Sequence, residues 1–236
     1  RQMCIRDRYY RGYSIDDLAQ NCGFEEISYL VMIGELPTSS QLDSFSKELK
    51  ANMVLPQEII DLITIVKDAH PMDVLRTAIS ALAGFESEVD DNSSEATLRK
   101  GTKLTAQAPT VVAAHARIRQ GLDPITPDPK LSIAANFLYM LFGTVPDPED
   151  AKLIDKDFVL HAEHGLNASS FGARVTASTQ SDLHSAITTG VGILKGPSHG
   201  GAAESVMKMA IDIGEPENTE KYIKDLLNNR GRVMGY

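Results

Sequence analysis

The sequence predicts an all-α fold. Apolar residues recur at intervals of three and four in one segment after another, which is the pattern of helices with one buried face. Glycine and proline separate these segments, and no stretch alternates apolar and polar residues at strand spacing for long. A chain of 236 residues, 42% of them hydrophobic, can bury one large helical core, or a large domain and part of a second.

The first half of the chain is expected to consist of short helices. Ser14 is a suitable N-cap for the first of them, and Gly23 is a suitable stop. His70 and Pro71 interrupt the pattern, because proline breaks the hydrogen bonding of a helix that has already begun. The segments expected to be helical are residues 16–23, 27–33, 40–53, 58–69 and 72–86.

The second half is expected to contain longer helices. Pro109 lies within an apolar pattern over residues 97–120 and should either kink that helix or split it in two. Residues 131–142 have no polar face, so they predict a fully buried helix. Residues 87–94 and the three-proline segment 121–130 predict loops. Further helices are expected up to His161, within the apolar pattern between 167 and 196, where one helix is expected over 181–194, and over 202–213 and 219–229.

Composition and charge exclude several classes of function. A net charge of −9 argues against a general nucleic-acid-binding surface. The longest mostly apolar run, residues 131–145, is too short to span a bilayer, and the N-terminus lacks the apolar core of a signal peptide. Cys4 and Cys22 predict neither a disulfide framework nor a zinc site. We therefore expect a cytoplasmic protein without a nucleic-acid or membrane partner.

Histidines are concentrated in the last third of the chain. Two of them occupy glycine-containing breaks between expected helices: His164 precedes Gly165, and His199 lies in the segment 196–201 just before the helix expected over 202–213. Two imidazoles carried at helix junctions predict a site, although position alone does not define its chemistry. The four histidines between residues 159 and 203 are His161, His164, His184 and His199.

Metal and nucleotide sites are poorly supported by these residues. His161 and His164 share a helix face and could bind a metal, but the sequence lacks the downstream Cys-x-x-Cys of zinc deaminases and the His-Glu-x-x-His of zincins. The glycines at 190, 192 and 196 miss the dinucleotide-binding spacing, follow no expected strand and form no P-loop. On the residues alone, each histidine would be a core side chain that is hydrogen-bonded to a neighbour, as His70, His115 and His184 are expected to be.

Five motifs in one order resemble the citrate synthase family. Together they extend from about residue 9 to residue 236, and their common order is far more specific than any one of them. The motifs are Tyr10-Arg-Gly-Tyr-Ser-Ile15, His70-Pro-Met-Asp-Val-Leu-Arg-Thr-Ala-Ile-Ser-Ala-Leu82, His161-x-x-His164-x-x-Asn167-Ala-Ser, Ser181-Asp-Leu-His-Ser-Ala-Ile-Thr-Thr-Gly190 and Lys195-Gly-Pro-Ser-His-Gly-Gly201.

The resemblance implies a division into two helical domains. Residues 9–200 would form most of a large domain, and residues 201–236 would begin a small domain that is cut off at Tyr236. Residues 1–8 contain three arginines and break with the composition that follows, so we expect them to be foreign to the protein. The chain would thus be a fragment, truncated at both ends.

The resemblance also implies roles for individual residues. His164 matches the family histidine that binds oxaloacetate, Asn167 matches a nearby polar contact, and His161 would support them. His199 matches the catalytic histidine that hydrogen-bonds the thioester carbonyl as acetyl-CoA is enolised; at a helix N-terminus its neutral form is favoured. The C-terminal residues resemble the start of a loop that wraps the adenine of coenzyme A: Val233, Met234, Gly235 and Tyr236.

The implied reaction is the condensation of acetyl-CoA with oxaloacetate to citrate and coenzyme A through an enol and citryl-CoA. Acetyl-CoA is a cosubstrate, no cofactor or metal is permanently bound, and the small bacterial or archaeal members are homodimers. In the family the second catalytic histidine, the aspartate base and the substrate-binding arginines follow Tyr236; between His161 and His199 only Arg174 and Lys195 are cationic. The alternatives are 2-methylcitrate synthase, which uses propionyl-CoA, a citryl-CoA lyase, and an inert helical fragment.

Overall fold

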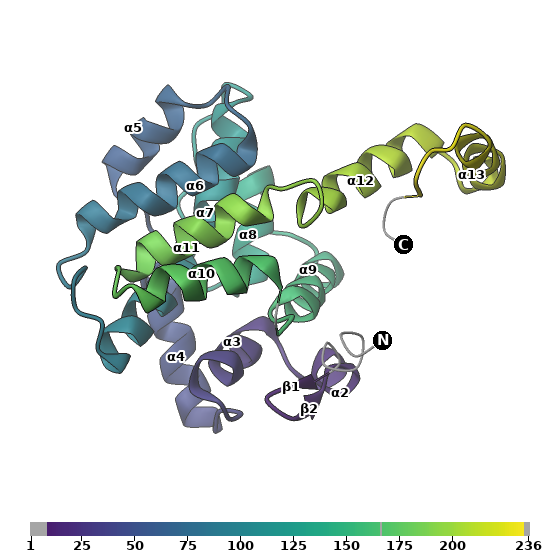
Figure 1. The fold of residues 1–236 in the computed structure, drawn as a ribbon. Coiled ribbons are helices and arrows are strands. Elements are labelled where there is room, and N and C mark those ends of the chain that lie inside the picture. Colours follow the sequence, from purple (N-terminus) through teal and green to yellow (C-terminus); the bar gives the residue numbers. More distant parts are fainter. Residues whose placement is uncertain (1–8, 166, 234–236) are drawn as a thin grey trace.

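The computed structural model describes residues 9–165 and 167–233 (Figure 1). The prediction of an all-α fold is confirmed, with one small exception at the N-terminal end. A two-stranded antiparallel hairpin, β1 (Tyr9–Tyr10) and β2 (Tyr13–Ser14), precedes the first helix. Arg11 and Gly12 form its turn with positive φ angles of 51° and 95°.

Short helices make up the first half, as expected. Thr38 starts one of them with a capping box, since its side chain accepts the Gln41 N–H while the Gln41 side chain accepts the Thr38 N–H. The elements are α2 (Ile15–Asn21), α3 (Phe24–Ile33), α4 (Ser39–Ala51), α5 (Gln57–Ile65), α6 (Pro71–Leu82) and the 3₁₀ turn η1 (Ala83–Phe85).

The second half of the chain begins with one long helix and continues with shorter ones. Pro109 lies within this helix, α7, without splitting it. The elements are α7 (Ser94–Ile118), α8 (Ile133–Phe142), α9 (Pro148–His161), α10 (Ala168–Ser178), α11 (Leu183–Leu194), α12 (Gly201–Ile213), the 3₁₀ turn η2 (Pro216–Asn218) and α13 (Thr219–Asn228).

The core is organised around α7, because this helix is apolar on two faces. Leu104 and Val111 pack in one cluster with α5 and α6, whereas Ala106 and Ala113 pack in a second cluster with α4 and α8. A third cluster joins the N-terminal hairpin to α2, α3 and α9. The third cluster contains the buried residues Tyr10, Leu18, Ile27, Leu30 and Val159.

The helix expected over 181–194 is present as α11. The apolar pattern between 167 and 196 contains a second helix, α10, and the two turn back on each other at Gln180 (φ 64°). They pack so closely that a Cβ added at Gly172 would lie 2.1 Å from the Ile193 Cδ1. Helix α8 is not fully buried, since Phe142 at its C-terminal end is 71% exposed; an apolar end that projects beyond the core has no helix to cover it.

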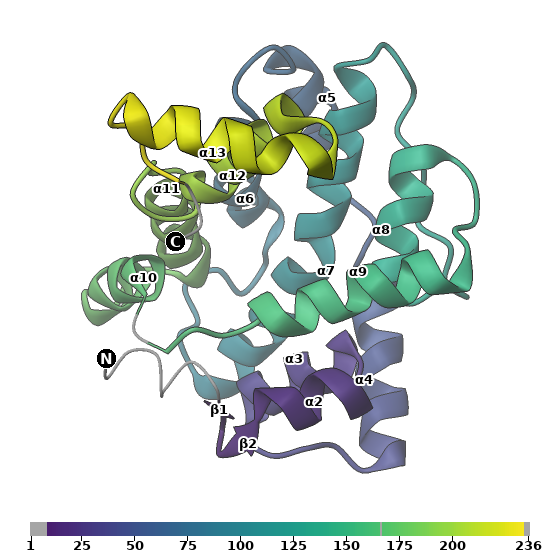
Figure 2. The same cartoon turned by 90° about the vertical axis from the view of Figure 1, so that its right-hand side faces the viewer.

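Helices α12 and α13 project from this body and bury no residue (Figures 1 and 2). They follow the glycine-rich turn after α11. The boundary between the large and the small domain is predicted at this turn, and it stays a prediction. The predicted foreign segment 1–8 lies outside the described residues. None of the helices in the described ranges combines the length and the apolar character that crossing a membrane would require.

Candidate active site

His164 lies in the turn that joins α9 to α10. Its side chain is exposed, and the turn reverses at Gly165, whose φ is 73°. The Glu163 carboxylate accepts the Gly165 N–H at 2.6 Å, and Asn167 starts α10 by accepting the Ser170 N–H at 2.8 Å. The turn is therefore shaped by its own side chains. The Asn167 oxygen caps a helix, and its predicted contact with a substrate remains a prediction.

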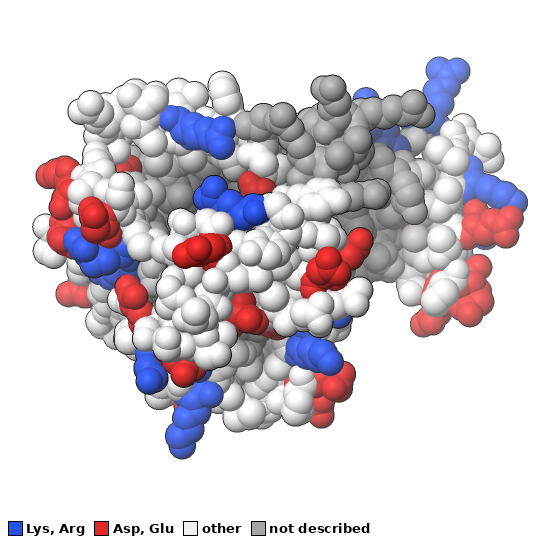
Figure 3. Space-filling view, turned by 90° about the horizontal axis from the view of Figure 1, so that it is seen from below, with Lys and Arg blue, Asp and Glu red and all other residues white. Residues whose placement is uncertain are grey.

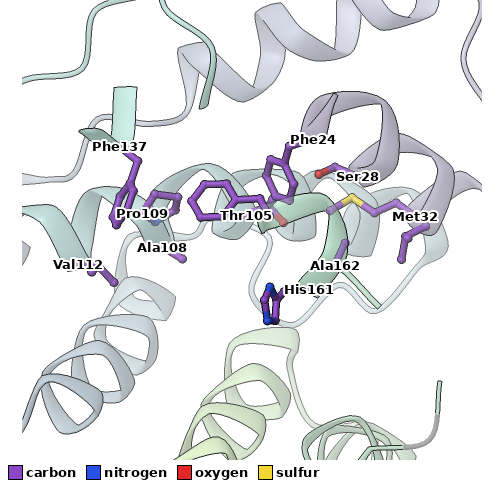
Figure 4. Close-up of a pocket in the computed structure, with 12 residues that line it drawn as sticks. Phe24, Ser28, Met32, Thr105, Ala108, Pro109, Val112, Phe137, His161 and Ala162 are labelled. Atoms are coloured by element: carbon purple, nitrogen blue, oxygen red, sulfur yellow. The ribbon is translucent and has the colours of Figure 1, made fainter. Parts of the chain in front are cut away.

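His161 belongs to the last turn of α9. Its Nδ1 lies 2.8 Å from the backbone carbonyl of Asp157, four residues earlier, and therefore donates to it. The ring lines an apolar cavity of about 460 Å³ between α3, α7, α8 and α9, opposite residues such as Phe24 and Pro109 (Figure 4). His161 thus faces this cavity, and its predicted support of His164 remains a prediction.

His199 lies in a tight turn between α11 and α12. The Gly196 carbonyl accepts two N–H groups there, from His199 at 2.9 Å and from Gly201 at 3.1 Å. A Cβ added at Gly201 would lie 2.7 Å from the Lys195 carbonyl, and one added at Gly200 would lie 2.6 Å from the Leu194 carbonyl. Only glycine fits at these two positions, because the backbone passes too close to itself for a side chain.

Ser169 connects the two histidine-bearing turns. Its Oγ lies 2.5 Å from the Nε2 of His199, and Ser169 belongs to the first turn of α10, five residues after His164. The structure thus brings His199 to the helix that begins directly after the His164 turn. Ser169 is not among the residues predicted from the sequence, although Ser169 is the last residue of the Asn167-Ala-Ser motif. Its hydroxyl can either donate to or accept from the imidazole ring.

Lys195 and His70 fasten this region to α6. The Lys195 ammonium lies 2.6 Å from one oxygen of Asp73, and Arg76 lies 3.0 Å from the other. The hydrogen bond from Lys195 is the main reason that the pKa of Asp73 lies below its ordinary value. His70 accepts the Met72 N–H at 3.2 Å through Nδ1, and its Nε2 lies 3.3 Å from Glu204 of α12.

Two of the three histidines expected in the core are there. His115 is 3% exposed, with its Nε2 2.9 Å from the Lys67 carbonyl. His184 is 2% exposed, and burial lowers its pKa, so the ring is neutral. The expectation for His70 is wrong: its side chain is 39% exposed, because the residue caps the N-terminus of α6 and does not pack in the core.

A family model described as "Citrate synthase, C-terminal domain" matches residues 4–236. The chain belongs to the citrate synthase family. Citrate synthase 2 of Bacillus subtilis is 47% identical over 229 residues, and 2-methylcitrate synthase 2 of Corynebacterium glutamicum is 46% identical over 233. The first match covers 96% of this chain and 62% of the relative, and the second 96% and 61%. The chain therefore spans less than two thirds of these relatives.

Solved citrate synthases share the fold. The crystal structure of the Pyrobaculum aerophilum enzyme superposes with a TM-score of 0.87 at 36% identity, over 96% of this chain and 58% of that one. Citrate synthase of Thermoplasma acidophilum, whose structure is described as a ternary complex with carboxymethyl coenzyme A and oxaloacetate, superposes with a TM-score of 0.87 at 28% identity, over 95% of this chain and 59% of that one. The all-α fold expected of the family is thus present over nearly the whole chain.

Charge around this citrate synthase fold is mixed. On the face in Figure 3, acidic and basic side chains are interspersed, and neither sign forms a continuous patch on the described part of that face. Lys195 is paired with Asp73, so it is not an uncommitted cation for an anionic substrate. Between His161 and His199 this leaves only Arg174 as a further cation, so these residues do not form a cationic cluster by themselves.

Two predicted features of the citrate synthase site lie at the limits of the structure. Val233 is the last described residue and is partly buried; Met234, Gly235 and Tyr236 lie outside the described residues. The coenzyme A contact predicted for all four remains a prediction. Within the described ranges, no three His, Cys, Asp or Glu side chains are grouped so that they could hold a metal ion.

Proposed function

We propose that this chain supplies the oxaloacetate- and enol-binding histidines of a citrate synthase, which condenses acetyl-CoA with oxaloacetate. The observation that carries the proposal is the Ser169–His199 contact, because it joins the two turns on which His164 and His199 lie. In a neutral imidazole one nitrogen donates and the other accepts. If the Ser169 hydroxyl donates to Nε2, the Nδ1–H of His199 is available to a ligand.

His199 is the proposed hydrogen-bond donor that stabilises the enol of acetyl-CoA. A base removes a methyl proton from acetyl-CoA, and the Nδ1–H of His199 hydrogen-bonds the thioester oxygen as negative charge develops there. The enol carbon then attacks the keto carbon of oxaloacetate, forming the carbon–carbon bond of citryl-CoA. Water hydrolyses the thioester and releases citrate and coenzyme A. The turn before α12 suits this role because its glycines let a ligand approach the backbone closely.

His164 is the proposed oxaloacetate ligand. It is exposed at the end of a rigid helix, in a turn held by the Glu163 carboxylate and by the Asn167 cap. Oxaloacetate carries two carboxylates, whereas Lys195 is already paired with Asp73. We propose that the missing counter-charges, the second histidine and the aspartate base come from the part of the enzyme that this chain does not include.

The second candidate is 2-methylcitrate synthase. It is favoured by the Corynebacterium glutamicum relative of that name, whose 46% identity nearly equals the 47% of the Bacillus subtilis citrate synthase. The two acyl groups differ by one methylene, which a pocket distinguishes by only about 1–3 kcal/mol. Few substitutions would therefore separate the two activities, and overall identity does not decide between them.

We also propose that the enzyme is a cytoplasmic homodimer. Phe171 and Val175 lie one turn apart on α10 and are 65% and 51% exposed. Adjacent exposed apolar side chains on a packed helix pair support an interface on this face. Val233 and the three residues after it are proposed to begin the coenzyme A loop.

The test compares this chain with a chimaera. The chimaera joins the chain to the part of the Bacillus subtilis relative that the match leaves uncovered. Coenzyme A release is measured with oxaloacetate and either acetyl-CoA or propionyl-CoA. We expect the chain alone to be inactive, because proton abstraction by a positioned base contributes about 10²–10⁴-fold, and the chimaera to be active. Turnover by the chain alone would contradict the assignment of the base, and a folded but inactive chimaera would contradict the proposed function.

A further inference from the structure

Tyr10 is far from the histidine turns in sequence, yet it contacts the helix that leads into the first of them. Its side chain is 1% exposed and packs in the cluster that contains Leu18 and Leu30. The phenol oxygen lies 3.0 Å from the carbonyl oxygens of both Val159 and Leu160, 149 and 150 positions away. A buried hydroxyl therefore joins the N-terminal hairpin to α9.

The two carbonyls belong to the last turn of α9. The Val159 carbonyl also accepts the Ala162 N–H at 3.4 Å, so the hydroxyl matters most for the Leu160 carbonyl. The last four carbonyls of a helix have no partner within it. Helix α9 does not end at a glycine: its C-cap Ala162 keeps helical angles (φ −65°, ψ −31°), and the left-handed residue comes only at Gly165. Burial raises the pKa of Tyr10, so the phenol stays protonated and remains a donor at neutral pH.

The hairpin that carries Tyr10 is itself anchored. Arg11, which has a φ of 51°, donates from Nη2 to the Val31 carbonyl in the last turns of α3 at 2.8 Å. Arg11 thus holds the hairpin to α3 while Tyr10 holds it to α9. The hydroxyl is presented by a fixed scaffold.

The segment from Leu160 to Gly165 is consequently held at both ends. Tyr10 binds its first carbonyl, and the Glu163 carboxylate accepts the last N–H, that of Gly165, at 2.6 Å. His164 lies between these two anchors. The direction in which its ring leaves the backbone therefore depends on where α9 ends, and Tyr10 contacts that end.

We propose that Tyr10 is a positioning residue for His164. The functional part rests on the proposed function, in which His164 binds oxaloacetate; the structural part does not need turnover. Loss of the hydroxyl leaves the Leu160 carbonyl without this donor, whereas the Val159 carbonyl keeps the Ala162 N–H at 3.4 Å. The backbone that carries the His164 ring is then expected to shift. The effect should be larger at His164 than at His199, because the turn of His199 is held by its own glycines and its ring contacts Ser169 of α10, not the end of α9.

The first experiment uses the 236-residue chain and the histidine ring signals in its NMR spectrum. Tyr10→Phe removes only the hydroxyl, and Tyr13→Phe is the matched control, since Tyr13 lies on the paired strand and is 42% exposed. The His164 signal is assigned with His164→Gln. We expect it to shift or broaden in Tyr10→Phe and to be unchanged in Tyr13→Phe, while the signals of His115 and His184 stay in place.

An unchanged His164 signal in folded Tyr10→Phe would overturn the proposal, as would an equal disturbance of His115 and His184, which would indicate a general loss of packing. The second experiment places both substitutions in the chimaera. Tyr10→Phe should raise the KM for oxaloacetate roughly three- to tenfold, the range for one lost hydrogen bond, and leave the KM for acetyl-CoA unchanged.

Equal changes in both KM values would contradict a role through His164. If the unaltered chimaera has no activity, the proposed function fails, whereas the NMR comparison still decides the role of Tyr10.

Discussion

The turn before α10 and the turn before α12 each carry a histidine, but they are held in different ways. Side chains hold the first: the Glu163 carboxylate accepts the Gly165 N–H, the Asn167 side chain starts α10, and the Tyr10 hydroxyl binds the end of α9. Each contact is a single hydrogen bond, so each can be removed by one substitution while the others remain.

The second turn is held by its backbone. The Gly196 carbonyl accepts two N–H groups, and there is no space for a Cβ at Gly200 or Gly201. One side chain from outside, Ser169, contacts the ring that this turn presents. The comparison teaches that the His164 turn should respond to substitution in small steps, whereas the His199 turn should tolerate almost none.

The largest expected effect comes from removing the imidazole ring of His199 or of His164. In the chimaera, His199→Ala should lower kcat by about 10²–10⁴-fold, because it removes the group that stabilises the developing enolate. His164→Ala should mainly raise the KM for oxaloacetate. Steady-state kinetics with each substrate varied in turn separate the two roles. Full-rate turnover by His199→Ala would remove the catalytic assignment.

Next in size is Gly201→Ala, which tests the backbone-held turn. The new Cβ would lie 2.7 Å from the Lys195 carbonyl, and forcing it in should cost about 1–3 kcal/mol of local stability. Amide hydrogen exchange at positions 199 and 201 measures that loss. Gly84→Ala is the control, because its Cβ would meet nothing within 4 Å. Equal exchange rates in both variants would show that the turn has more space than the structure gives it.

Ser169→Ala should lower kcat roughly tenfold, the upper range for one hydrogen bond, because the His199 ring loses the partner that orients it. The kcat and KM values of the chimaera are measured beside those of Ser170→Ala, a change on the same helical turn. A rise in the KM for oxaloacetate without a change in kcat would assign Ser169 to the His164 side of the site instead.

Asn167→Ala should destabilise the start of α10 by about 1 kcal/mol, the usual value for a lost N-cap. Amide exchange at Ser170 reports the change, and Asn167→Asp should restore protection because aspartate caps equally well. If Asn167→Asp keeps the cap but loses oxaloacetate affinity in the chimaera, Asn167 also contacts the substrate.

The smallest expected effect is the pH dependence of stability that arises from His184, in the first turn of α11. Burial lowers the pKa of His184 in the folded chain, so the unfolded chain binds more protons just below its ordinary pKa. Stability from this residue is complete above about pH 6.5 and falls as the pH drops, by at most about 1.4 kcal/mol per pH unit. Urea unfolding between pH 7.5 and 5.5 measures the slope. His184→Tyr should flatten it, and an unchanged slope would assign the pH dependence to other groups.

Much of the fold could be predicted from the sequence, because helix starts and stops depend on local chemistry. Gly23 and Pro71 both fall at helix boundaries, as the sequence predicts, although α3 begins directly after Gly23, at Phe24, three residues earlier than expected. Local pattern was insufficient for the close packing of α10 against α11, which turn back on each other at Gln180. A left-handed glutamine carries no sequence signature as clear as glycine does.

The sequence by itself determined the all-α class, the positions of His164 and His199 at helix junctions, and the family to which they point. Only the tertiary structure decided which side chains hold them. The contacts Tyr10–Leu160 and Ser169–His199 join residues 150 and 30 positions apart, and no periodicity records such a pairing. Periodicity reports which face of a helix is buried, whereas a hydrogen bond across the fold depends on how those faces are packed together.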